Sequence, residues 1–338
     1  MRALFYPAFD KLELRDLPPP QPAPGEVLLR VAATGVCGSE LESFKGRSPR
    51  RPPPLIMGHE FCGIVVAVTD GDDEKLIGRR FVSNSLVSCG KCAACQRGDT
   101  HLCPQRQIFG MHRPGAFAEY AAVPTRVLLP WPDELPATAA CLAEPLANGV
   151  HIVNLTRHLA VERALIIGAG PIGLMCQQAL QAMRGVNTLV CDLSTGRLDV
   201  ARRLGAAHTV VSRDNDVAKE ITRWTGGDGV DLVVDAVGAA TTKRLSLTAL
   251  RPGGAAVWIG LHGDRIEIDS YQVTLPERQI HGTYSARMDE LATAIDLMTQ
   301  KKVDVSSWTQ PDSIEHGVEA FHRVLSPGES DIKAILTF

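Results

Sequence analysis

The chain has 338 residues, of which 45% are hydrophobic and 22% are charged, which is ordinary for a globular protein with room for two domains. Its formal net charge of −3 provides no basic surplus for binding a nucleic-acid backbone. The charges at Asp10, Lys11 and Glu13 exclude a signal peptide, and no apolar run reaches the length of a membrane span. We therefore expect a cytoplasmic protein that acts on a small molecule, without a nucleic-acid or membrane partner.

Short strand-like runs broken by glycine and proline fill the chain as far as Trp131, which predicts an irregular β-rich domain. After a helical stretch at 133–155, apolar strands alternate with helices. This alternation predicts an α/β fold in which helices cover both faces of a doubly wound parallel sheet. The expected strands are 2–6, 11–17, 27–37, 61–70, 78–84, 116–124, 162–170, 187–194, 208–212, 230–238, 255–263 and 331–338. The other expected helices are 171–183, 196–206, 216–226, 241–250, 288–300 and 313–325.

The sequence GAGPIG places Gly168, Gly170 and Gly173 between an expected strand and an expected helix. Gly168 would permit a tight turn, Gly170 would let the backbone approach a pyrophosphate, and Gly173 would allow close packing of the helix on the strand. The helix begins at Pro171 and Ile172, and its first turn would face the phosphates with free N–H groups. The motif therefore predicts a dinucleotide site.

An acidic residue, Asp192, ends the next expected strand, about twenty residues further on, where it would accept hydrogen bonds from the adenosine ribose. The same carboxylate would repel a 2′-phosphate, so we expect NAD in preference to NADP. Arg197 could stack on the adenine or partly offset the charge of Asp192. Val237 and Gly260 follow two later strands and are expected to line the nicotinamide pocket.

Cys89, Cys92, Cys95 and Cys103 form a C-x₂-C-x₂-C-x₇-C pattern in one expected loop. In a reducing compartment, clustered cysteines more often bind metal than form disulfides. Four thiolates complete the tetrahedral shell of a structural zinc and leave no position open for a substrate. An iron–sulfur cluster is the alternative, but bacterial ferredoxins have a shorter last spacing. We expect a structural zinc here and the chemistry elsewhere.

A second set of potential metal ligands comprises Cys37, His59, Glu60 and Glu144. A catalytic zinc takes about three protein ligands and keeps one position open, so Cys37, His59 and one carboxylate would suffice. Each residue also has an ordinary structural interpretation, as a buried thiol, a core histidine or a charge at a helix N-terminus. Spacing alone does not decide between these interpretations.

Six segments, in their order along the chain, resemble the zinc-dependent medium-chain dehydrogenases, and most closely the branch of sorbitol, other polyol and sugar-phosphate dehydrogenases. The segments are GVCGSE, GHEFCG, CGKCAACQRGDTHLC, GAFAEY, AEPLA and GAGPIG. The resemblance implies a GroES-like catalytic domain at 1–148 with a structural-zinc lobe at 85–104, a Rossmann domain at 149–284, and a return to the catalytic domain at 285–338. It places the active site between the two domains. It also implies a homodimer or homotetramer, for which the edge strand near AAVWIG could form the interface.

The resemblance further implies that Cys37 and His59 bind a catalytic zinc, with Glu60 or Glu144 as a further ligand. It assigns to Ser39 the relay of the substrate proton. The four-cysteine loop would bind the second zinc of the chain. The implied activity is hydride transfer between NAD and a secondary alcohol, namely a polyol, a sugar alcohol or its phosphate.

Three features depart from the family pattern. Glu42 stands where alcohol and threonine dehydrogenases often have a histidine that completes the proton relay, and Thr69 replaces a turn glycine. The loop before the metal-binding histidine contains Arg47, Arg50 and Arg51, which could bind a substrate phosphate or could form a solvated surface loop.

Other functions remain as alternatives. The chain could be a zinc dehydrogenase of threonine or a cyclitol, or a non-catalytic dinucleotide-binding protein. A zinc-free quinone or enoyl reductase would lack the cysteine loop, and a metal-dependent lyase would not need the glycine turn with its following acid.

Overall fold

The computed structural model describes residues 1–69, 71–212, 217–326, 328 and 331–338. The chain divides into two compact units: one contains Met1–Glu144, Ala286–Lys301 and Val305–Phe338, and the other contains Pro145–Ser285 and Lys302–Asp304. Asp70 and Asp216, at the ends of the expected strand 61–70 and the expected helix 216–226, lie outside the described residues.

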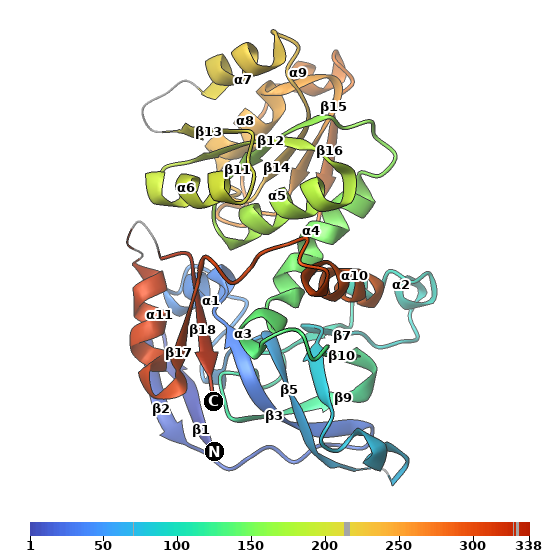
Figure 1. Ribbon diagram of the computed structural model, residues 1–338, viewed down its shortest axis with the longest axis vertical. Coiled ribbons are helices and arrows are strands. Elements are labelled where there is room, and N and C mark those ends of the chain that lie inside the picture. The colour runs from blue at the N-terminus through green and yellow to red at the C-terminus, as the bar shows by residue number, and fades with distance from the viewer. Residues whose placement is uncertain (70, 213–216, 327, 329–330) are drawn as a thin grey trace. The chain divides into compact units, whose positions relative to one another are not determined.

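The first unit is rich in short strands (Figure 1). Its main sheet has the order β10-β6-β5-β3-β18-β17, with β9 also pairing with β3; smaller sheets have the orders β2-β1-β4 and β7-β8. The strands are β1 (Arg2–Ala8), β2 (Lys11–Asp16), β3 (Glu26–Gly35), β4 (Leu55–Ile56), β5 (Glu60–Val68), β6 (Arg80–Ser83), β7 (Leu86–Val87), β8 (Gln107–Ile108), β9 (Tyr120–Pro124), β10 (Leu128–Pro130), β17 (Thr309–Ser313) and β18 (Lys333–Thr337). The helices are α1 (Gly38–Phe44), η1 (Gly71–Leu76), α2 (Ala93–Gln96), η2 (Thr100–Leu102), η3 (Thr125–Val127), α3 (Ala137–Ala140), α10 (Met288–Thr299), η4 (Ile314–His316) and α11 (Gly317–Leu325).

Strand β3 is central to the first unit. Val27, Leu29 and Val31 alternate with more exposed residues and are buried in an apolar cluster, as a strand with one face in the core requires. At its end, Gly35 pairs with Glu60 of β5 on one side and with Ile335 of β18 on the other. The end of β3 therefore brings together three segments that are far apart in the sequence.

The second unit contains a six-stranded parallel sheet with the order β13-β12-β11-β14-β15-β16. Helices α5 and α6 lie against one face and α7 and α8 against the other (Figure 1), so the predicted doubly wound α/β fold is confirmed. The strands are β11 (Arg163–Ile167), β12 (Asn187–Asp192), β13 (His208–Val211), β14 (Val230–Asp235), β15 (Leu250–Trp258) and β16 (Gln279–Gly282). The helices are α5 (Pro171–Arg184), α6 (Thr195–Arg203), α7 (Val217–Thr225), α8 (Ala240–Thr248) and α9 (Tyr271–Thr274); α4 (Ala143–Leu155) runs from the first unit into the second.

The strand that contains AAVWIG, β15, lies inside the sheet, between β14 and β16. The edge strand is β16, which is only four residues long and pairs in parallel with β15. Because its residues alternate between half-buried and exposed, it lacks the long apolar run that identified the inner strands.

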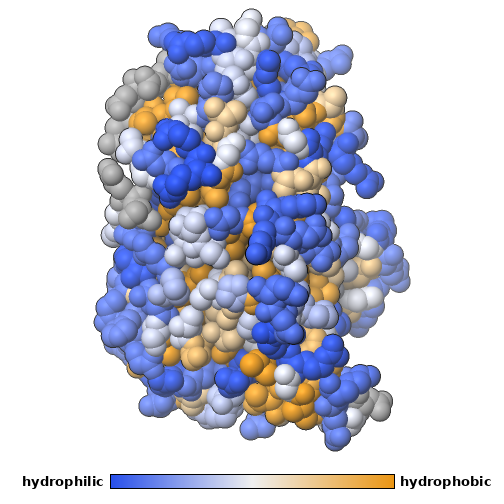
Figure 2. All heavy atoms as spheres, in the orientation of Figure 1, coloured by the Kyte–Doolittle hydropathy of each residue, from blue (hydrophilic) through white to orange (hydrophobic). Residues whose placement is uncertain are grey.

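In the view of Figure 2, hydrophilic side chains cover most of the surface of each unit, and apolar atoms show in small groups between them. Among the residues described, none of the helices combines the length and the hydropathy that a membrane span needs.

Candidate metal and cofactor sites

A group of three potential metal ligands lies at the end of β3. Cys37 directly precedes α1, His59 precedes β5, and Glu60 is the first residue of β5. The pairing of Gly35 with Glu60 in the β3–β5 register places these segments side by side. One sulfur, one imidazole nitrogen and one carboxylate oxygen from the three residues all lie within 4.8 Å of one another. This donor set and spacing fit a zinc ion.

Glu40, which was not identified from the sequence, orients this group. Its buried carboxylate accepts hydrogen bonds from the backbone N–H of Cys37 (3.0 Å) and of Gly58 (2.8 Å), and lies 2.8 Å from Nδ1 of His59. Burial works against ionisation, but His59 and the nearby Arg51 hold the pKa of the Glu40 carboxyl below its usual value. An ionised Glu40 makes Nδ1 of His59 the protonated nitrogen and leaves Nε2 free to bind a metal.

Glu60 forms a buried ion pair with Lys333, the first residue of β18. The two charged atoms are 2.5 Å apart, and each side chain is 1% exposed. Burial alone would lower the pKa of Lys333, but the Glu60 carboxylate opposes this and raises it. Gly35 leaves the space for this pair, because a Cβ atom there would lie 2.2 Å from the Glu60 oxygen.

Glu144, at the start of α4, is buried near the same group. Burial raises the pKa of its carboxyl, and the negative charge of Glu60 raises it further. His59 and a hydrogen bond with Ser85 act in the opposite direction and lower this pKa. Its oxygens are not part of the group of donors that lie within 4.8 Å of one another. Of the two glutamates, Glu60 is therefore the better placed to share a metal with Cys37 and His59.

Ser39 and the arginines of the loop before His59 have separate roles. The Ser39 hydroxyl donates to the Cys37 sulfur over 3.3 Å. Arg51 is buried, and its guanidinium donates to the backbone oxygens of Gly110 (3.0 Å) and Ser39 (3.2 Å). It therefore supports the loop through two of its N–H groups.

The other two arginines of that loop are exposed. Arg47 lies 3.5 Å from Glu42, and Nε of Arg50 donates to the Ser48 hydroxyl. The loop thus contains two exposed arginines and a buried one.

The four cysteines of the expected zinc lobe are close together in the structure. The sulfur–sulfur distances are 3.5 Å for Cys92–Cys95, 3.8 Å for Cys92–Cys103 and 3.9 Å for Cys89–Cys95. A tetrahedron with metal–sulfur bonds of about 2.3 Å has edges of about 3.8 Å, so the spacing fits one zinc ion. Backbone N–H groups of Lys91 and Cys92 lower the pKa of Cys89 to about 6, which favours the thiolate that binds metal.

The glycine turn joins β11 to α5 in the second unit. Gly168 has φ +96°, and a Cβ atom on Gly173 would lie 1.8 Å from the oxygen of Gly168. Around the Cβ position of Gly170, by contrast, no atom of the described chain lies within 4 Å. Pro171 and Ile172 begin α5. The turn is therefore open where a pyrophosphate would approach and tight where the helix meets the strand, which fits a dinucleotide.

Asp192 ends β12 beside this turn. Its carboxylate accepts hydrogen bonds from the backbone N–H of Ala169 (2.7 Å) and of Ser194 (2.9 Å). Arg197 lies in the first turn of α6, where its backbone N–H donates to the Ser194 hydroxyl. The acid thus fixes the glycine turn as well as lying where an adenosine ribose is expected.

Two further turns meet the glycine turn at the carboxyl edge of the sheet. A Cβ atom on Gly168 would lie 2.7 Å from Cγ2 of Val237, which follows β14. A Cβ atom on Gly260, which follows β15, would lie 2.2 Å from the carbonyl carbon of Val237. The structure therefore brings the expected cofactor residues of the three turns into contact.

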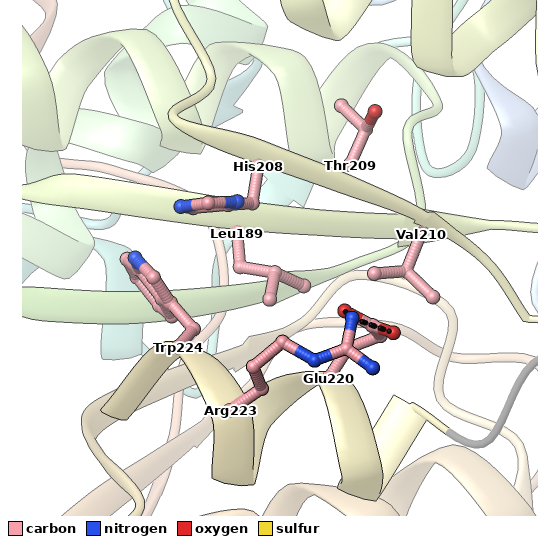
Figure 3. Close-up of a pocket in the computed structure, with 7 residues that line it drawn as sticks. All are labelled: Leu189, His208, Thr209, Val210, Glu220, Arg223 and Trp224. Atoms are coloured by element: carbon pink, nitrogen blue, oxygen red, sulfur yellow. Dashed lines mark hydrogen bonds and ion pairs between the residues drawn. The ribbon is translucent and has the colours of Figure 1, made fainter. Parts of the chain in front are cut away.

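A separate pocket of about 280 Å³ lies between α7 and strands β12 and β13 (Figure 3). Within it, Glu220 and Arg223 form an ion pair at 2.9 Å, and the rings of His208 and Trp224 are 5.4 Å apart. It lies along the strands and not at their carboxyl edge, so it is not part of the cofactor site. Its lining residues are Leu189, His208, Thr209, Val210, Glu220, Arg223 and Trp224.

Comparison with known proteins identifies two family matches. Residues 23–133 match the model of the alcohol dehydrogenase GroES-like domain, and residues 171–300 match that of zinc-binding dehydrogenases. An L-threonine 3-dehydrogenase of Pyrococcus abyssi is 36% identical over 260 residues, which are 76% of this chain and 74% of that protein. A D-arabitol-phosphate dehydrogenase of Enterococcus avium is 31% identical over 329 residues, 96% of this chain and 93% of that protein.

A solved structure of a zinc-binding dehydrogenase from Sinorhizobium meliloti 1021, bound to NADP, superimposes with a TM-score of 0.90. It is 28% identical, and the match covers 100% of this chain and 99% of that one.

Proposed function

Because this chain belongs to the family of zinc-binding alcohol dehydrogenases, we propose that it oxidises a secondary alcohol of the polyol class with NAD. It is an NAD(P)-dependent alcohol dehydrogenase by family; the substrate and the choice of NAD are the proposal. The observation that carries it is the group of Cys37, His59 and Glu60, whose donor atoms lie within 4.8 Å of one another.

Zinc bound there would supply a Lewis acid that lowers the pKa of a bound hydroxyl towards neutrality, and bound NAD would accept the hydride. The residues of the chain hold and orient these groups. Glu40 keeps Nε2 of His59 free for the metal, and Glu60 is the carboxylate favoured by the geometry. The Ser39 hydroxyl, beside the Cys37 sulfur, would take the proton of the substrate hydroxyl.

The proton leaves Ser39 without the histidine of the usual relay. Glu42, which stands at that position, is about one third exposed and lies 3.5 Å from Arg47. Because Glu42 is partly exposed, water can reach this position. We therefore expect solvent, and not a side-chain relay, to accept the proton beyond Ser39.

The similarity to D-arabitol-phosphate dehydrogenase over 93% of that protein favours a polyol or its phosphate. L-Threonine is the second candidate substrate, because the L-threonine 3-dehydrogenase is the more similar in sequence, at 36% identity. Since Arg51 is buried and donates to backbone oxygens, the loop before His59 offers no ready-made arginine cluster for a phosphate. We therefore place the unphosphorylated polyol first.

Rates of NAD reduction by the zinc-loaded enzyme test this assignment. The panel should contain five-carbon and six-carbon polyols, their phosphate esters and L-threonine, each with NAD and with NADP. The proposal predicts the highest kcat/KM for a polyol with NAD. A higher value for L-threonine than for every polyol would favour the second candidate, and a phosphate ester that outperforms its polyol would require a phosphate site elsewhere.

We also propose a homodimer formed through β16. This edge strand presents unpaired backbone groups, and exposed apolar side chains lie in or near it. Tyr271 and Leu275 are 74% and 75% exposed, and Leu261 and Ile280 are also exposed. Light scattering after chromatography should show a dimer that dissociates in the double variant Tyr271→Asp, Leu275→Asp. A monomeric wild type would contradict the proposal, and a tetramer would require a second interface.

A further inference from the structure

Asp235 ends β14 and is completely buried. One oxygen of its carboxylate accepts hydrogen bonds from the backbone N–H of Val237 (3.0 Å) and of Gly238 (2.9 Å), and the other accepts from the Thr242 hydroxyl (3.1 Å). A buried acid is costly unless its oxygens are hydrogen-bonded, and here both are. The carboxylate thereby determines the shape of the turn that follows β14.

The backbone oxygen of Asp235 fixes a second turn. It accepts from the N–H of Ile259 (3.1 Å) and of Gly260 (2.9 Å), which follow β15. The two turns are in backbone contact, since a Cβ atom on Gly238 would lie 2.1 Å from the oxygen of Gly260. Asp235 is thus the residue through which both turns are connected.

The position of these turns along the sheet determines which half of a dinucleotide they face. Strands β12 and β14 lie on opposite sides of β11. The ribose of the adenosine half is expected at Asp192, at the end of β12, and the pyrophosphate at Gly170, after β11. With these two groups in place, the rest of the dinucleotide extends towards β14. The turns held by Asp235 then face the nicotinamide half.

We infer that Asp235 is a positioning residue for the nicotinamide half of the cofactor, an inference that rests on the proposed function. It touches no cofactor atom itself. It acts through Val237, whose Cγ2 packs against Gly168, and through the Gly260 turn. Loss of the carboxylate should therefore affect nicotinamide recognition and leave recognition of the adenosine and pyrophosphate largely unchanged.

The test compares two ligands that differ only by the nicotinamide ring, namely NADH and ADP-ribose. In Asp235→Asn the carboxamide oxygen can still accept from the N–H groups of Val237 and Gly238, but without the negative charge. The amide nitrogen faces the Thr242 hydroxyl, which can then donate to the backbone oxygen of Ala239. The dissociation constant of NADH should rise about tenfold, as expected when a buried hydrogen-bond acceptor loses its charge, whereas that of ADP-ribose should change less than about twofold. Fluorescence titration measures the first constant, and calorimetry measures the second.

The same strand offers a matched control at its other end. Asp231 accepts hydrogen bonds from the N–H groups of Glu162 and Arg163, both at 2.9 Å, and pairs with Arg251 at 2.5 Å. Asp231→Asn should lower the unfolding temperature without changing the ratio of the two dissociation constants. An equal change of that ratio in Asp231→Asn, or an unchanged ratio in a folded Asp235→Asn, would overturn the inference.

Thr242→Val decides the question if Asp235→Asn does not fold. It removes only the hydroxyl donor and should shift the ratio in the same direction by a smaller factor; an unchanged ratio would overturn the inference. Wild-type protein that binds neither NADH nor ADP-ribose would instead refute the proposed function, so the two failures are distinguishable.

Discussion

The Nζ atom of Lys333 lies 2.5 Å from a carboxylate oxygen of Glu60, and both side chains are almost completely buried. Lys333 begins the C-terminal strand β18, and Glu60 begins β5; both strands pair with β3. The closing strand of the chain therefore supplies the counter-charge for a carboxylate at the proposed zinc site. This contact links the stability of the first unit to the geometry of the site.

Removal of the Lys333 charge should destabilise the first unit. In Lys333→Met, the Glu60 carboxylate stays buried without its partner, which typically costs about 3–5 kcal/mol. Denaturant unfolding of the metal-free protein measures the change in free energy of unfolding. The double variant Glu60→Gln, Lys333→Met should lose much less than the two single variants combined. Additive losses would show that the two charges are not coupled.

Loss of the Glu40 charge should weaken zinc binding. Glu40→Gln keeps the shape of the side chain but removes the negative charge and replaces one acceptor oxygen by an amide nitrogen. It therefore holds Nδ1 of His59 as a donor less firmly, and such changes typically reduce metal affinity about 10–100-fold. Competition with a chromophoric chelator measures this affinity. Glu290→Gln is the matched control, because Glu290 is also buried and accepts from the backbone N–H of Arg287 at 2.9 Å, before helix α10. An unchanged zinc affinity in Glu40→Gln would refute the orienting role.

Two alanine substitutions in the glycine turn should have different effects. In Gly170→Ala the new methyl group meets no described protein atom, so the unfolding temperature should stay near that of the wild type while the affinity for NADH falls. In Gly173→Ala the methyl group would collide with the oxygen of Gly168, so stability should fall as well. Thermal unfolding and NADH titration separate the two effects. A Gly170→Ala protein with unchanged affinity would contradict the pyrophosphate assignment.

Asp192 should determine the preference for NAD over NADP. In Asp192→Asn the carboxamide retains an oxygen that can accept from the N–H of Ala169 or Ser194, but the negative charge is lost. The ratio of the NAD and NADP values of kcat/KM should therefore shift towards NADP, since the repulsion of a 2′-phosphate is removed. A ratio that does not change would refute the role at the ribose.

Asp231 should make stability depend on pH below about 4. Partial burial opposes its ionisation, but Arg251 and the N–H groups of Arg163 and Glu162 hold the pKa of the carboxyl below its usual 3.8. A carboxyl with a lowered native pKa stabilises the fold above its unfolded pKa and loses this contribution as the pH falls towards the native pKa. The difference in unfolding temperature between the wild type and Asp231→Asn should thus shrink below about pH 4. A constant difference would contradict this expectation.

Local patterns were sufficient to predict the glycine turn and the four-cysteine loop. Gly168 and Gly173 lie in one short segment whose strand and helix are both evident from hydrophobic periodicity. Cys89 and Cys103 are likewise within one loop. The fold class followed from the same alternation, and the family resemblance was confirmed by the matches to both domains.

The supporting contacts could not be predicted, because they depend on pairing between distant segments. Lys333 reaches Glu60 only through the β3–β18 and β3–β5 registers. Glu40 lies in a helix that was not predicted from the sequence, and its position three residues after Cys37, the spacing of a capping box, was the one available signal. The hydrogen bond from Arg51 to a backbone oxygen likewise appears only when Gly110 is brought beside it.

Zinc content measured together with turnover tests the central claim most directly. We predict two zinc ions per chain in the wild type. In Cys37→Ser we predict one zinc ion, no measurable alcohol oxidation and an NADH dissociation constant close to that of the wild type. A Cys37→Ser protein that retains both zinc ions and oxidises the same alcohol at the wild-type rate would contradict the account.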